Sequence, residues 1–123
     1  MRLRTVCAAA LALGCRAAPP PPPEPPDLAA RRAQVLALIG EPRCERVEQC
    51  RAVPLGAKPC GGPWRYVVFS TATADSVRLV AAAAEHTVLE AEQNRRTGAV
   101  SDCRFVAAPT LSCSRGYCVS GSR

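Results

Sequence analysis

The spacing of apolar residues predicts a helix shortly after a proline-rich segment. From Asp27 to Ile39, apolar side chains recur at intervals of three and four residues, which is the period of a helix with one buried face. Asp27 is placed to cap the free amides of the first turn, and Gly40 with Pro42 supplies the stop. The positions that share one face are Leu28, Arg32, Val35 and Ile39.

A second, longer helix is predicted over residues 75–96. Thr73 or Asp75 is placed to cap its start, and Gly98 to end it. When each residue is turned by 100°, six small apolar side chains fall within one narrow stripe, which we expect to pack closely against a sheet. The stripe comprises Val77, Val80, Ala81, Ala84, Val88 and Ala91.

Two segments between the helices have the composition of strands. Residues 64–71 are rich in β-branched and aromatic side chains and predict the main strand. Residues 51–56 predict a short edge strand, because Pro54 has no amide proton to donate within a sheet. Between the two strands, Gly61 and Gly62 permit the backbone to turn.

The last part of the chain carries shorter strand patterns. Residues 105–108 predict a strand that Pro109 ends, and residues 111–113 and 117–119 predict a hairpin. This order of elements predicts an α+β fold, with a small antiparallel sheet, one main packing helix and a shorter N-terminal helix.

The first residues have the pattern of a secretory signal peptide. Arg2 and Arg4 precede a short apolar run over residues 6–13, and Gly14 and Cys15 follow it. The run is too short to cross a bilayer as a helix.

The segment Leu11-Ala12-Leu13-Gly14-Cys15 resembles the lipobox of bacterial lipoproteins. The resemblance implies export, removal of residues 1–14, and diacylation of the Cys15 thiol, so that a lipid anchor holds the protein to a membrane. Arg16 stands where aspartate would retain a Gram-negative lipoprotein in the inner membrane, so the resemblance implies the outer membrane, with the domain facing the periplasm or the cell surface.

An alternative to lipidation stays open, because Ala12 and Leu13 depart from the commonest lipobox. Ordinary signal cleavage after Ala17 or Ala18 would leave a soluble secreted protein. In either case, residues 15–26 are predicted to form a proline-rich tether of about 3.1 Å per residue. Residues 27–123 then form one small domain.

Eight cysteines are many for a chain of 123 residues. If Cys7 leaves with the signal peptide and Cys15 carries lipid, six remain, and an even number in an exported domain predicts three disulfides. The spacings do not suit a structural zinc site, and we expect no metal or other cofactor. Pairing cannot be deduced, but we expect at least one bond to join the first three cysteines to the last three. The disulfide cysteines are Cys44, Cys50, Cys60, Cys103, Cys113 and Cys118.

Charge and composition argue against two classes of function. The formal charge of +6 is spread along the chain, with one Trp, two Tyr and two Phe, whereas nucleic-acid binding requires a concentrated basic face with stacking aromatics. Catalysis is also not expected. The only histidine, His86, is expected on the solvent face of the second helix, away from an acid or a nucleophile.

The loop before the main strand is the one candidate binding surface. Cys60-Gly61-Gly62-Pro63 precedes Trp64 and Tyr66, so Gly61, Gly62, Trp64 and Tyr66 are candidate binding residues. The alternative is a purely structural turn. The run from Cys50-Arg51 to Cys60-Gly61-Gly62-Pro63, with Tyr66, resembles small uncharacterised lipoproteins of Gram-negative bacteria, a likeness that implies no activity.

These observations predict a lipid-anchored, non-enzymatic binding or scaffolding module of the bacterial envelope, with an envelope protein as partner. Two other classes stay open. A protease inhibitor would present Lys58-Pro59-Cys60 ordered but unpacked. A hydrolytic enzyme would place an acid near His86 in a pocket.

Overall fold

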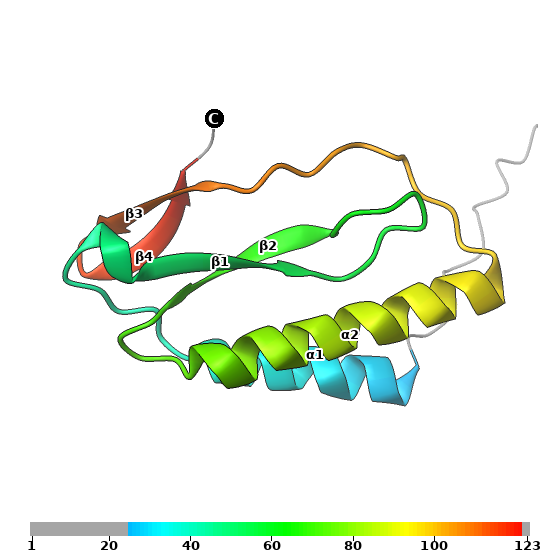
Figure 1. The fold of residues 1–123 in the computed structure, drawn as a ribbon, viewed down its shortest axis with the longest axis horizontal. Coiled ribbons are helices and arrows are strands. Elements are labelled where there is room, and N and C mark those ends of the chain that lie inside the picture. The colour runs from blue at the N-terminus through cyan, green and yellow to red at the C-terminus, as the bar shows by residue number, and fades with distance from the viewer. Residues whose placement is uncertain (1–24, 122–123) are drawn as a thin grey trace, which may run out of the picture.

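The computed structural model describes residues 25–121, so the predicted signal peptide, the lipidation site and most of the tether lie outside the described residues. The fold is α+β, as predicted, but it has two small antiparallel sheets in place of one. Two helices pack on one face of the first sheet, and the second sheet lies across its other face (Figure 1).

Helix α1 (Pro26–Ile39) confirms the first predicted helix. On its predicted face Leu28 and Val35 are buried and Ile39 is half-buried, whereas Arg32 is exposed. The expected cap is wrong, because the Asp27 side chain makes no capping hydrogen bond. A proline at the first helical position replaces it, where the fixed backbone angle suits a helix and the missing amide proton costs nothing.

Helix α2 (Ser76–Thr97) begins and ends as predicted. The Asp75 carboxylate accepts a hydrogen bond from the Arg78 amide at 3.1 Å, and Gly98 ends the helix in the left-handed conformation, with φ of +63°.

The predicted buried face of α2 is wrong. Val77 is 81% exposed, whereas Leu79 is fully buried. The buried positions recur at intervals of three and four residues and pack against α1 and the first sheet. Alanine occurs on every side of this helix, so the pattern of small apolar residues did not fix its rotation. The buried positions are Leu79, Ala82, Ala83 and His86.

The first sheet pairs β1 (Cys50–Leu55) with β2 (Arg65–Ser70), from Cys50↔Ser70 to Leu55↔Arg65. Both predicted strands are confirmed, and both are edge strands, which tolerates a proline in β1. One face of the sheet completes the core with the helices. The core residues are Val35, Val53, Leu55, Phe69, Leu79, Ala82 and Ala83.

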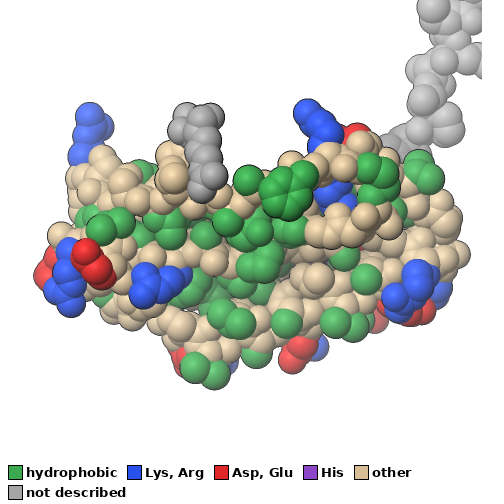
Figure 2. Space-filling model, turned by 45° about the horizontal axis from the view of Figure 1, so that its top comes forward, with side chains coloured by type: hydrophobic (Ala, Val, Ile, Leu, Met, Phe, Trp, Pro, Cys, Tyr) green, Lys and Arg blue, Asp and Glu red, His purple; other side chains and the backbone are tan. Residues whose placement is uncertain are grey.

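The second sheet is the predicted hairpin, β3 (Thr110–Ser114) with β4 (Tyr117–Gly121). The predicted strand over residues 105–108 is wrong. Residues 99–109 form a connection without a strand partner, and Phe105 is 90% exposed. We call this segment the connecting segment. Apolar side chains are visible on the face of the molecule shown in Figure 2.

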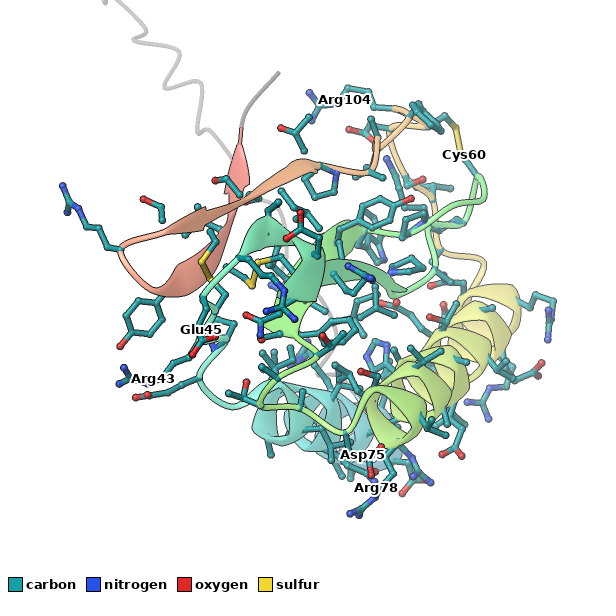
Figure 3. All side chains as sticks on the ribbon, turned by 60° about the vertical axis from the view of Figure 1, so that its left-hand side comes forward. Arg43, Glu45, Cys60, Asp75, Arg78 and Arg104 are labelled. Carbon is teal, nitrogen blue, oxygen red and sulfur yellow. A yellow bond between two sulfur atoms is a disulfide. The ribbon has the colours of Figure 1, made fainter. Side chains whose placement is uncertain are left out.

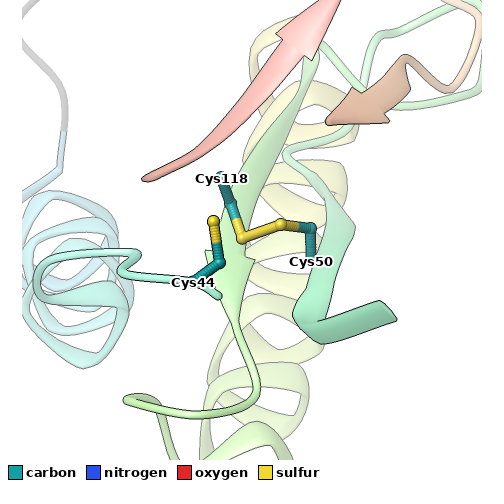
Figure 4. A group of neighbouring side chains, drawn as sticks. All are labelled: Cys44, Cys50 and Cys118. Atoms are coloured by element: carbon teal, nitrogen blue, oxygen red, sulfur yellow. A yellow bond between two sulfur atoms is a disulfide. The ribbon is translucent and has the colours of Figure 1, made fainter. Parts of the chain in front are cut away.

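Three disulfides are present, as predicted, and all three join the first three cysteines to the last three: Cys44–Cys113, Cys50–Cys118 and Cys60–Cys103. Their Cα atoms lie 5.2–6.0 Å apart, within the usual range. Cys44, Cys50 and Cys118 lie together in a second buried cluster (Figure 4). Each bond closes a loop of 43–69 residues, which is worth about 4 kcal/mol in the chain-entropy model.

The orientation of α2 gives a paired test. Leu79→Ala should lower the free energy of unfolding by about 2–5 kcal/mol, because it leaves a cavity at a fully buried site. Val77→Ala, at an exposed site on the same helix, should change it by no more than about 0.5 kcal/mol. Urea unfolding with the disulfides intact measures both. Equal effects of the two substitutions would contradict the observed rotation of α2.

Candidate functional site

A cleft of about 470 Å³ lies between the two helices and the end of the first sheet. Its volume falls within the range usual for small-molecule sites. Both helices, both strands of the first sheet and the loop between β1 and β2 line it, so the cleft exists only in the folded domain. Its lining residues are Arg32, Leu55, Gly56, Trp64, Arg65, His86 and Glu90.

Gly56 allows the loop to approach α2 closely. Its φ is +83°, and a Cβ atom at this position would lie 2.5 Å from Glu90 Oε2 and 2.9 Å from Trp64 Cδ1. The Glu90 carboxylate accepts the Ala57 amide proton at 2.6 Å, and Asn94 donates to the Ala57 carbonyl at 2.7 Å. Two side chains of α2 therefore hold the loop in place at one wall of the cleft.

His86 is buried, with 3% of its surface exposed, so its predicted place on the solvent face is wrong. The predicted grouping of His86 with Leu79 and Glu90 on one face of the helix is right, but that face points inward. Because His86 and Glu90 are one helical turn apart, they line the same cleft.

Two arginines from different elements also line the cleft. Arg32 comes from α1, and Arg65 is the first residue of β2. The pairing of Arg65 with Leu55 places both on the helix-facing side of the sheet. Arg32 shares the predicted apolar face of its helix, and although it is exposed it lines the cleft. Nothing in the sequence pattern singled out Arg65.

Trp64 is the only one of the four candidate binding residues that lines this cleft, and it is 45% exposed. Gly61 and Gly62, with φ of +97° and +78°, form a tight turn closed by hydrogen bonds with Lys58. Tyr66 pairs with Pro54 on the opposite face of the sheet and is half-buried. The structure therefore separates Trp64 from the other three.

The loop is held to the connecting segment by a buried lysine. Lys58 Nζ lies 2.6 Å from the Asp102 carboxylate and 2.7 Å from the Arg104 carbonyl, and 5.4 Å from the centre of the Trp64 ring. The Cys60–Cys103 disulfide joins the same two segments, and Figure 3 shows Cys60 and Arg104 at one end of the molecule. The pKa of the Asp102 carboxyl is held well below its usual range, because Lys58 and Arg104 donate hydrogen bonds to it.

The chemistry of the cleft favours binding over acyl transfer. Its lining contains no serine, threonine or cysteine to act as a nucleophile. It does contain a histidine and an acid, the pair that an enzyme would need for proton transfer. Elsewhere, the Sγ atoms of Cys44, Cys50 and Cys118 lie within 4.8 Å of one another, but disulfide bonds occupy all three, and a metal requires thiolates.

Comparison with models of protein families, with curated proteins and with solved structures finds no match to this chain. Within residues 25–121, neither helix is long and apolar enough to cross a membrane.

The Asp102 ion pair predicts how stability depends on pH. A carboxyl whose pKa is lower in the folded state stabilises the fold above its unfolded pKa, about 3.9, and this contribution is lost as pH falls through the folded pKa. We expect wild type to be more stable than Asp102→Asn at pH 6, and the difference to shrink below about pH 4. Urea unfolding at a series of pH values measures it. Two curves that stay parallel down to pH 2 would contradict this role for Asp102.

Proposed function

We propose that this chain is an exported, lipid-anchored binding module of the bacterial envelope, and that the cleft beside Trp64 is its recognition site. The observation that carries the proposal is the set of three disulfides. Disulfides persist in oxidising compartments such as the periplasm and are rare in the cytosol. They support export independently of the N-terminal pattern.

The lipobox-like segment supplies the anchor in this proposal. Diacylation of Cys15, with the amino-terminal acyl chain that lipoproteins receive, provides more than one acyl chain, whereas a single chain binds membranes only marginally. The seven residues 19–25, which precede α1, include six prolines. In a polyproline II conformation they would extend about 22 Å, which places the domain clear of the lipid headgroups. Arg16 after the lipidated cysteine favours the outer membrane.

The protease-inhibitor alternative loses its expected support. It required the segment Lys58-Pro59-Cys60 to be ordered but unpacked, so that a protease could engage it. The Lys58 side chain is only 4% exposed and is bound to Asp102. A buried lysine in an ion pair is not presented to a protease.

The enzyme alternative gains one observation, because His86 and Glu90 line the same cleft. Proton transfer would need both side chains to reach the reacting group. However, Glu90 Oε2 already accepts the Ala57 amide proton at 2.6 Å. That contact gives Glu90 a structural role, and binding without chemistry remains the function that we propose.

Lipidation is tested by expressing the full chain in a Gram-negative host with an alkyne analogue of palmitate. We expect the mature protein to begin at Cys15 and to carry the label in the membrane fraction. Cys15→Ser should remove the label and release the protein, because the acylated thiol is gone. Cys7→Ser, a matched change inside the predicted signal peptide, should leave the label and the membrane association unchanged. A mature chain that begins after Ala17 or Ala18, without lipid, would contradict the anchor.

A further inference from the structure

We propose that the cleft beside Trp64 binds a small ligand that carries a single carboxylate on a ring. This inference rests on the proposed function only in taking the cleft as the recognition site, and it does not depend on lipidation.

The Arg65 guanidinium favours one negative charge on the ligand. It lines the cleft together with Glu90, whose negative charge opposes the binding of a more highly charged anion. Within residues 25–121, the Arg65 guanidinium makes no ion pair with an acidic side chain. A planar guanidinium matches a carboxylate through two parallel hydrogen bonds. A dianionic phosphate would also face repulsion from Glu90.

Trp64 supplies a flat apolar surface at the same cleft. Its indole lies against Gly56, and the Lys58 ammonium lies over the ring at 5.4 Å. Its backbone amide donates to the Leu55 carbonyl at 3.2 Å. These contacts hold the ring in place although 45% of the residue is exposed. A fixed and half-exposed indole suits the apolar face of a ligand ring.

The interior of the cleft limits the ligand further. Leu55 and Gly56 are buried apolar positions, and His86 is the buried polar one. A volume of about 470 Å³ holds a small molecule but not a folded domain or a membrane surface. A sugar acid of one or two rings combines a single carboxylate, a ring with an apolar face, and hydroxyl groups for polar side chains.

The chain contains one tryptophan, so its fluorescence reports directly on the cleft. The experiment uses the full chain with Cys15→Ser and titrates three probes that share one ring: glucuronate, glucose and glucose 6-phosphate. We expect saturable binding of glucuronate that weakens as salt is added. We expect glucose and glucose 6-phosphate to bind at least about tenfold more weakly, because the first lacks the charge and the second carries too much.

Two charge-matched variants test the role of the arginine. Arg65→Gln should raise the Kd for glucuronate at least about tenfold through loss of a charge-assisted contact. Arg78→Gln removes the same charge near the start of α2, at the other end of the molecule from Cys60 and Arg104 in Figure 3, and should leave the Kd within twofold. If Arg65→Gln does not fold, the salt dependence of glucuronate binding by the Cys15→Ser protein tests the charged contact instead.

Three results would overturn the proposal. They are equal affinity for glucuronate and glucose, tighter binding of glucose 6-phosphate than of glucuronate, and no saturable response to any probe. Each leaves the lipidation result untouched, so failure of this inference is distinguishable from failure of the anchor.

Discussion

Two neighbouring disulfides, Cys44–Cys113 and Cys50–Cys118, are the constraint on which the rest of the structure depends. A two-stranded hairpin is at best marginally stable by itself, and β3–β4 packs only a few apolar residues, among them Leu111, against the sulfur cluster. The cross-links hold this hairpin across β1 and β2. Two backbone hydrogen bonds, from the Cys44 amide to the Gly116 carbonyl and from the Cys118 amide to the Pro42 carbonyl, also join the hairpin to the segment after α1. The domain thus has a helix-facing apolar core and a sulfur-rich second core on the other side of its sheet.

The cleft lies at the opposite end of the first sheet, where contacts from two sides fix the loop after β1. Glu90 and Asn94 fix the loop after β1 from the helix side, while Lys58 binds the connecting segment on its far side. Trp64 lies between these contacts and lines both the cleft and a smaller hollow beside the connecting segment. The cleft walls therefore come from distant parts of the chain, which is why a local motif could not reveal the site.

The position of α2 could be predicted from the sequence because Asp75 caps its start and Gly98 ends it. The even number of cysteines predicted disulfides, and at least one of them was expected to join the first three cysteines to the last three. The prediction failed where packing between distant parts of the chain determines the structure. Leu79 is the only large apolar side chain that α2 buries, and it lies in the core cluster with Val35 of α1 and Val53 of β1. Alanine on all sides of the helix obscured this rotation. That error moved His86 from the interior to the surface. Residues 105–108 had strand composition, but no strand lies opposite to pair with them in the described chain.

The pairing of the six cysteines tests the central claim most directly, because every other contact of the hairpin depends on it. The exported protein is digested without reduction, with free thiols blocked beforehand, and its linked peptides are identified by mass spectrometry. The account predicts that Cys44 is joined to Cys113, Cys50 to Cys118, and Cys60 to Cys103. A direct bond between Cys113 and Cys118, or six blocked thiols, would contradict it, since the hairpin would then have no covalent link to β1.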